Sequence, residues 1–329
     1  MTSATTNAKT NAATWGIVAT IKAPAHDIVN FAAYHLDLGA DHIFIFLDDA
    51  NPTAEHTLAT HPNITVTRTD DAYWQTTNGR RPHKHQVRQV HNASRAYAQA
   101  TQLSWLAHID VDEFLCPAGD VSNALAQMPS TTPVARVAPC ESLCAEDQPD
   151  LDPALIYCKA KTPGGPKGQK IERALYPMFG GFFKSGFISH TAGKIFVRRG
   201  QPNLRFAIHR AFANKDQPLI ETPLPQVELC HRHVESWEKW LKIMQFRLSK
   251  GSYRAELEQS IDPSSGRISR HQMFSTLTQS GTSELRAFFD ETCLATPKLR
   301  ADLNKFGLLR NYRLDIARKV AKHFPEFSE

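Results

Sequence analysis

Three carboxylates follow an apolar run in the stretch LAHIDVDEFL, residues 106–115. If this segment is extended, Asp110 and Asp112 point to the same side and their carboxylates can converge on one ligand. Two oxygen donors so placed repel each other unless a cation lies between them, and Mg2+ or Mn2+ favours such ligands. We therefore predict a divalent-metal site here, with Glu113 pointing the other way toward a backbone or basic partner. The alternative is an Asp-rich turn that caps the next element.

Basic side chains gather at two places where they could neutralise a bound anion. The stretch GRRPHKHQVR, residues 79–88, lies just before or within a predicted helix, and Lys194 begins a short apolar run. When a bond to an anionic leaving group such as a diphosphate breaks, the developing charge is stabilised by a metal together with lysine or arginine. We predict this role for Lys194 and Lys84, and a cofactor contact for Lys22. Arg80 and Arg81 fit a solvated loop better.

The elements that must position these residues alternate along the first hundred positions. Short β-rich runs occur at 15–21, 42–47, 64–68 and 105–109, and helical spacing occurs at 26–38, 53–60 and 84–102. This alternation predicts an α/β fold with a mostly parallel sheet covered by helices on both faces. Ligands of such sheets bind beyond the carboxyl ends of the strands, where Asp48, Asp49, Asp110 and Asp112 fall.

The remaining chain has a looser pattern. Further strands are predicted at 133–139 and 194–198, a Pro/Gly/Lys loop at 159–170, and a helix at 236–251. In that helix an apolar face is formed by Trp237, Trp240, Leu241, Met244 and Leu248. The last seventy residues indicate mixed helices rich in Lys and Arg. We expect a disordered tail at 1–13, one domain at 14–250 and a helical basic extension at 251–329.

Composition and charge narrow the class of protein. A hydrophobic fraction of 41% and a charged fraction of 22% are those of a soluble globular protein. The polar start resembles no secretory signal, so we expect a cytoplasmic protein. Residues 1–165 carry 11 Lys+Arg against 17 Asp+Glu, or −6, and residues 166–329 carry 27 against 16, or +11. This asymmetry suits a metal held by one half and an anion by the other; a solvated basic surface or contact with anionic membrane are alternatives.

The six cysteines are scattered along the chain, which argues against a disulfide framework. We expect reduced, partly buried thiols. A structural zinc site formed by Cys140, Cys144, Cys230 and His233 is the alternative, although the spacing is not that of a standard zinc finger.

Several motifs together resemble one family. These are Ala33-Tyr34-His35 with LGADHI at 38–43, a strand that ends in Asp-Asp, IDVDEFL at 109–115, and HRHVESW at 231–237 before a long helix. This set is similar to bacterial family 2-type glycosyltransferases, in the branch related to the family 92 enzymes. The resemblance covers roughly residues 15–255. It implies a GT-A fold with a Rossmann-related sheet, a nucleotide-sugar donor and Mn2+ or Mg2+.

The resemblance also implies roles for particular residues. Asp110 and Asp112 match the D-x-D motif, which contacts the ribose and the metal that bridges the diphosphate. Asp48 or Asp49 matches the acid that hydrogen-bonds the nucleotide base or ribose. His231 matches a histidine near the diphosphate and metal, and His233 is a second candidate ligand.

An inverting transfer also needs a general base that deprotonates the acceptor hydroxyl. Ala145-Glu146-Asp147 has the x-E-D form that such bases often take in this fold. It lies closer to the D-x-D motif than the fold usually places it, and Glu141 competes with Asp147. The stereochemical outcome, inverting or retaining, stays open.

Other classes fit less well. Ala23-Pro24-Ala25-His26 stands where a dinucleotide oxidoreductase would have G-x-G-x-x-G, and no nucleic-acid recognition motif occurs. We expect a hexosyltransferase-type enzyme of polysaccharide biosynthesis that moves a sugar from a UDP-linked donor to a glycan or lipid-linked acceptor. The alternatives are a nucleotidyltransferase and a sugar-nucleotide-binding protein without turnover.

Overall fold

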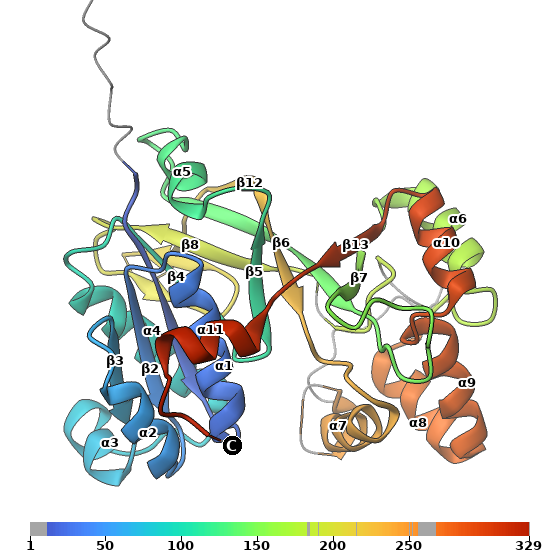
Figure 1. The fold of residues 1–329 in the computed structure, drawn as a ribbon, viewed down its shortest axis with the longest axis horizontal. Helices are drawn as coiled ribbons and strands as arrows, with labels where there is room; N and C mark the ends of the chain where they lie inside the picture. Colours follow the sequence, from blue (N-terminus) through green and yellow to red (C-terminus); the bar gives the residue numbers. More distant parts are fainter. Residues whose placement is uncertain are drawn as a thin grey trace, which may run out of the picture. The chain divides into compact units, whose positions relative to one another are not determined.

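The computed structural model describes residues 12–182, 185–189, 191–214, 216–249, 251, 253–255 and 268–328. The chain divides into two compact units, each assembled from separate segments (Figure 1). The first unit comprises Met1–Ala138, Ala192–Leu229 and Asp315–Glu329, and the second comprises Pro139–Thr191 and Cys230–Leu314. The predicted ranges 14–250 and 251–329 are continuous, so they do not coincide with these units. Residues 1–11 of the predicted tail lie outside the described residues.

The first unit is built around a sheet whose central strands are almost uninterrupted apolar runs. Its strands are β1 (Trp15–Ile21), β2 (His42–Leu47), β3 (Ile64–Arg68), β4 (Trp105–His108), β8 (Lys194–Arg198) and the first part of β6 (Val134–Ser142). They lie in the order β6-β8-β4-β1-β2-β3. β1 pairs in parallel with β2 and β4, and β2 pairs in parallel with β3. The carboxyl ends of these four strands therefore meet at one edge of the sheet.

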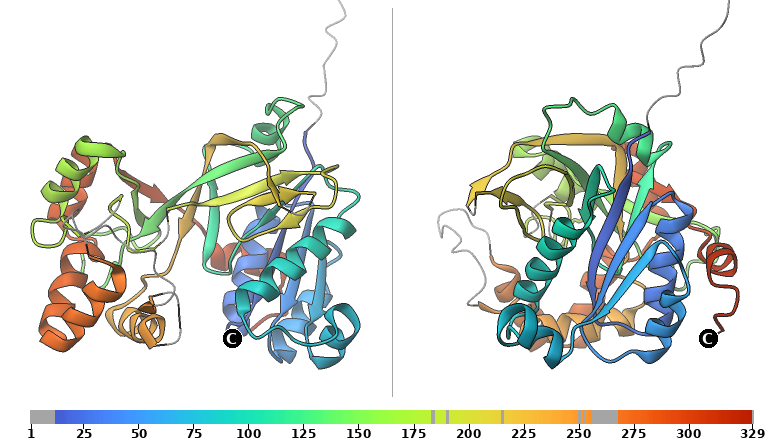
Figure 2. Two further views of the ribbon diagram at one scale, coloured as in Figure 1. Left: turned by 180° about the vertical axis from the view of Figure 1, so that it is seen from behind. Right: turned by 90° about the vertical axis from the view of Figure 1, so that its left-hand side faces the viewer.

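Helices cover both faces of this sheet, as predicted. α1 (Ala25–Asp37) and α2 (Pro52–Ala59) pack on one face, where Ile17, Ala19 and Ile21 of β1 point, and α11 (Ile316–His323) lies against α1. α4 (His85–Gln99) covers the opposite face, where Val18 and Phe44 meet its alanines. The right-hand view of Figure 2 shows α1 and α4 on opposite sides of the strands. The period of two along each strand thus supplies two apolar faces.

The sheet is mixed, which corrects the prediction of a mostly parallel one. β8 runs antiparallel to both β4 and β6. An apolar run identifies a buried strand but carries no information about its direction, so the sequence pattern could not reveal this reversal. Because Ala107 pairs with Phe196, the start of β8 lies beside the carboxyl end of β4.

The other elements of the first unit are short. They are α3 (Asp71–Asn78), β5 (Glu113–Pro117), α5 (Val121–Ala126), β9 (Arg205–Phe206), β10 (Ala211–Ala213), β11 (Gln217–Pro218) and most of β12 (Glu221–His231). β9, β10 and β11 form a small antiparallel sheet, and β12 pairs with β5 and β6.

The second unit has its own apolar core. The end of β6 pairs with β7 (Ile156–Ala160), and β7 pairs antiparallel with β13 (Leu309–Tyr312). Its helices are α6 (Gly165–Leu175), α7 (Trp237–Ser249), α8 (Arg270–Ser280), α9 (Thr282–Thr292) and α10 (Pro297–Lys305). The predicted apolar face of α7 is confirmed: Trp240 and Met244 are buried, and its other members pack against the same core.

Two expectations for this unit need correction. The predicted loop at 159–170 contains the end of β7 and the start of α6, because Pro166 occupies the first turn of a helix, where no amide donor is needed. β13 adds a strand to a region expected to be only helical. Among the described residues, no helix has the length and apolar character that crossing a membrane requires.

Candidate functional site

The D-x-D segment forms a turn and not an extended strand. β4 ends at His108, and the amide of Glu113 donates to the carbonyl of Asp110 over 3.0 Å. The Glu113 carboxylate turns back and accepts the Asp110 amide over 2.9 Å. Glu113 therefore has the backbone partner that was predicted for it, and it closes the turn that presents Asp110 and Asp112 at the carboxyl end of β4.

Lys194 is the cation that meets these carboxylates. Its ammonium nitrogen lies 2.6 Å from Oδ2 of Asp110 and 3.3 Å from Oε2 of Glu113. The lysine side chain is 1% exposed and that of Glu113 is 3% exposed, whereas Asp110 keeps 32% of its side chain accessible. Lys194 was predicted to neutralise a diphosphate, but here it is buried and holds two acids in place.

The charges around Asp110 and Lys194 keep both side chains ionised at neutral pH. Burial would raise the pKa of Asp110, but the charge of Lys194 outweighs it and holds the pKa well below its ordinary 3.8. Burial would lower the pKa of Lys194, but Asp110 and Glu113 keep it above its ordinary 10.5. Asp110 is thus an ionised, partly exposed carboxylate in a fixed orientation.

A second acid, at the carboxyl end of β2, has a different environment. Asp48 is 1% exposed and accepts two hydrogen bonds from Arg88, over 2.7 and 2.6 Å, one from Arg81 over 3.1 Å, and one from His85 over 3.0 Å. Burial would raise the pKa of Asp48, but the hydrogen bonds and charges of His85 and Arg88 lower it to about 2. Asp49 beside it is 39% exposed, 3.9 Å from Lys22.

Because Asp48 is buried and Asp49 is not, the two acids should respond differently to mutation. We expect Asp48→Asn to lower the free energy of unfolding by about 2 kcal/mol, through loss of charge-assisted hydrogen bonds. Asp49→Asn is the matched control and should change it by less than about 1 kcal/mol. The Asp48 contribution is present above pH 3.8 and lost as the pH falls through about 2, so urea melts at pH 7 and pH 2 should separate the variants only at pH 7. Equal effects of both substitutions would contradict this assignment.

α4 supplies polar partners to three neighbouring strands. His85 and Arg88 bind Asp48 after β2, and Gln89 donates to Oδ1 of Asp110 over 2.7 Å. Asn92 donates to the hydroxyl of Thr20 in β1 over 3.1 Å. The sequence prediction did not include Gln89 or Asn92. Their signal is the spacing 85, 88, 89 and 92, which places four polar residues on one helical face.

The motif Ala33-Tyr34-His35 fixes the strand that follows the D-x-D turn. The Tyr34 hydroxyl donates to the carbonyl of Leu115 over 2.7 Å, and the Leu115 amide donates to Nε2 of His35 over 3.4 Å. His35 is buried, which lowers its pKa to about 3, so it is neutral and its Nδ1 can donate to the carbonyl of Phe31. Both backbone polar atoms of Leu115 are therefore held by side chains of α1.

The candidate bases Glu141 and Asp147 both lie in the second unit, but they differ in exposure to solvent. Glu141 is fully buried and accepts the amides of Ile188 and Ser189 over 3.1 and 2.6 Å. Burial would raise its pKa, but Lys159 and other neighbours lower it to about 2, which makes it a weak base. Asp147 is exposed, with a left-handed φ of 57°.

The remaining residues predicted to bind phosphate or metal are divided between the two units. In the first unit, Lys84 is an exposed residue at the N-cap of α4. In the second, the rings of His231 and His233 lie 4.4 Å apart at the end of β12, and His233 is buried. The predicted metal set of Asp110, Asp112, His231 and His233 is thus divided between the two units, and its role as one site stays a prediction.

Comparison with known proteins gives little further information. No family model matches the chain, and no curated protein matches it. A mycobacterial protein of known crystal structure shows 11% identity and a TM-score of 0.31, with 57% of this chain and 54% of that chain covered. HddC from Yersinia pseudotuberculosis shows 8% identity and a TM-score of 0.35, with 70% of this chain and 97% of that chain covered. This chain thus spans about half of the mycobacterial protein.

Proposed function

We propose that the chain is a metal-dependent glycosyltransferase of GT-A type, which moves a sugar from a nucleotide-sugar donor to an acceptor hydroxyl. The donor is UDP-linked, and the acceptor is a glycan or a lipid-linked intermediate. The observation that carries the proposal is the turn after β4, where ionised Asp110 and half-buried Asp112 stand at the ligand-binding edge of an α/β sheet.

The donor set fits a hard divalent cation. Carboxylate oxygens are the ligands that Mg2+ and Mn2+ prefer, and each carboxylate oxygen has a lone pair beyond the one that a hydrogen bond uses. Lys194 and Gln89 fix the orientation of Asp110, so the carboxylate is held for a ligand before that ligand arrives. When bound, the cation would neutralise the diphosphate leaving group.

Other residues at the carboxyl ends of the strands support the binding of a nucleotide diphosphate. The amides at the N-terminus of α4 favour anions, and exposed Lys84 lies at this end of the helix. Partly exposed Asp49 is the better candidate for a ribose or base contact, because the buried Asp48 already has several partners. Lys194 acts in this proposal by orienting Asp110 and not by touching phosphate. Asp147 remains the proposed base, since Glu141 is buried and weakly basic.

Substitution of Asp112 tests the metal site. In a thermal-shift assay with UDP and Mn2+, at UDP about 100 times its Kd, the wild-type chain should gain about 2.7 kcal/mol of stability. We expect Asp112→Asn to lose most of this gain, because a neutral amide binds the cation weakly; the gain of each variant is measured against its own ligand-free melt. Asp216→Asn, at a carboxylate that is 88% exposed, is the control. A ligand response that Asp112→Asn leaves intact would refute the metal site.

Product analysis separates transfer from the alternatives. Release of UDP from a UDP-sugar in the presence of Mn2+ supports the proposal. Release of pyrophosphate from UTP and a sugar phosphate would identify a nucleotidyltransferase instead. Binding without either product would identify a sugar-nucleotide-binding protein.

A further inference from the structure

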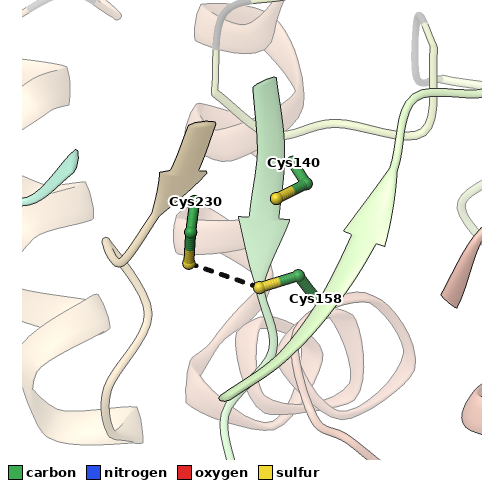
Figure 3. Close-up of side chains that lie close together, drawn as sticks. All are labelled: Cys140, Cys158 and Cys230. Carbon is green, nitrogen blue, oxygen red and sulfur yellow. Dashed lines mark hydrogen bonds between the residues drawn. The ribbon is translucent and has the colours of Figure 1, made fainter. Parts of the chain in front are cut away.

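Three thiols from distant parts of the sequence meet in the second unit. Cys140 lies on β6, Cys158 on β7 and Cys230 on β12, and both β7 and β12 pair with β6. Their sulfur atoms all lie within 4.8 Å of one another, and the sulfurs of Cys158 and Cys230 are 3.4 Å apart (Figure 3). Each of the three residues is 0% exposed. The four-residue zinc set predicted from the sequence included Cys144, whose thiol instead donates to the carbonyl of Glu235.

We propose that Cys140, Cys158 and Cys230 form a binding site for one thiophilic d10 cation, of which Zn2+ and Cu+ are the common examples. Thiolates are soft ligands that select these cations. With metal–sulfur bonds of about 2.3 Å, three sulfurs around one cation lie about 3.8–4.0 Å apart. The 3.4 Å between the sulfurs of Cys158 and Cys230 is below this value, and no pair of the three sulfurs is more than 4.8 Å apart, so shifts of at most about 1 Å complete the site.

The chemistry of binding is a proton exchange. Each thiol loses its proton as its sulfur bonds to the cation, so three thiols and one cation give one thiolate complex and three protons. Three thiolates without a cation would be very costly in this buried place, so binding and deprotonation must occur together. Binding should weaken as the pH falls. The sulfurs of Cys158 and Cys230 are in thiol contact and not at disulfide distance.

The site is independent of the proposed transferase function, because all three ligands lie in the second unit and the D-x-D turn lies in the first. Its test therefore uses metal binding as the readout and not activity. The reduced, metal-free full-length chain is titrated without oxygen with Cd2+, which reports on a zinc-type site, and separately with Cu+ supplied from a chelator. Thiolate-to-metal charge-transfer absorption in the ultraviolet gives the stoichiometry.

We expect one equivalent of cation to saturate the absorption, with Cys158→Ser abolishing it. Cys144→Ser is the matched control, since Cys144 is also a buried thiol of the second unit, and it should bind like the wild type. Competition between Zn2+ and Cu+ identifies the preferred member of the class. Saturable binding that survives Cys158→Ser, or that is lost in Cys144→Ser, would overturn the proposal.

A second measurement uses only the wild-type chain and so does not depend on how a variant folds. The protein is alkylated under mildly denaturing conditions with and without the cation, and the modified cysteines are identified by mass spectrometry. Selective protection of Cys140, Cys158 and Cys230 supports the site. Protection of a different set, no protection with either cation, or a Cys158–Cys230 disulfide in place of metal binding would overturn it.

Discussion

Lys194→Met should lower the free energy of unfolding of the first unit by about 3–5 kcal/mol, the range found when one partner of a buried ion pair is removed. Methionine fills nearly the same volume but leaves Asp110 and Glu113 facing each other without the ammonium that separates them. The loss is large because the lysine and the glutamate are almost fully buried, so water cannot replace the missing charge. Amide hydrogen exchange should show the loss of protection in peptides of the first unit.

The pH dependence of this effect follows from the pKa shifts. The pKa of Asp110 is lowered, so its contribution is present above pH 3.8 and lost as the pH falls through the lowered value. The pKa of Lys194 is raised, so its contribution is present below pH 10.5 and lost as the pH rises through the raised value. The free energy of unfolding of the wild type should therefore exceed that of Lys194→Met most between these two pH limits. This difference should become smaller in acid.

Lys22→Met is the matched control in the first unit, because that lysine is 69% exposed and 3.9 Å from its acid. It should change the unfolding free energy by no more than about 0.5 kcal/mol. A loss below about 1 kcal/mol for Lys194→Met would mean that the pair does not hold the turn as described.

Lys159→Met should destabilise the second unit by a similar amount, about 3–5 kcal/mol. The Lys159 ammonium lies 3.5 Å from the Glu141 carboxylate and donates to the carbonyl of Thr292 over 2.9 Å, and both side chains of the pair are at most 3% exposed. Removing the charge leaves a buried carboxylate without a cation and a buried carbonyl without this donor. Hydrogen exchange should report the effect in peptides of the second unit and not in β1 or β2.

Two further variants make this test specific. Lys161→Met, two residues along the chain at an exposed position, should leave the stability within about 0.5 kcal/mol of the wild type. Adding Glu141→Gln to Lys159→Met removes the unpaired charge and should recover part of the loss. The pKa of Glu141 is lowered to about 2 from 4.5, so the wild-type contribution is present above pH 4.5 and lost as the pH falls through about 2. No recovery in the double variant would show that the carboxylate charge is not the source of the loss.

Much of the fold could be predicted because apolar periodicity dominates its formation. The runs at 15–21, 42–47, 64–68 and 194–198 are strands with those same bounds. β12 was missed because its residues alternate weakly and include two prolines, and β13 was missed because only pairing with β7 defines it. Pairing partners far apart in sequence leave no local pattern.

The site was predicted less completely for a related reason. Strand-end position placed Asp48, Asp49, Asp110 and Asp112 at one edge of the sheet. Lys194 was selected for its charge and not for its position at that edge. Which acid is buried depends on partners from another element: Arg88 approaches Asp48 only because the first turns of α4 lie beside the carboxyl end of β2. The direction of Glu113 also depended on a turn that the apolar run did not indicate.

The arrangement of α4 limits how this chain can change in length. One helical face, with His85, Arg88, Gln89 and Asn92, reaches the ends of two strands and the body of a third. Because each residue advances the helix by about 100°, one residue inserted after Arg88 would turn Gln89 and Asn92 away while His85 and Arg88 kept their places. Insertions and deletions should therefore be tolerated in the segment before residue 85 but not between 85 and 92. A library of single-residue insertions would thus show a sharp boundary at the start of this helix.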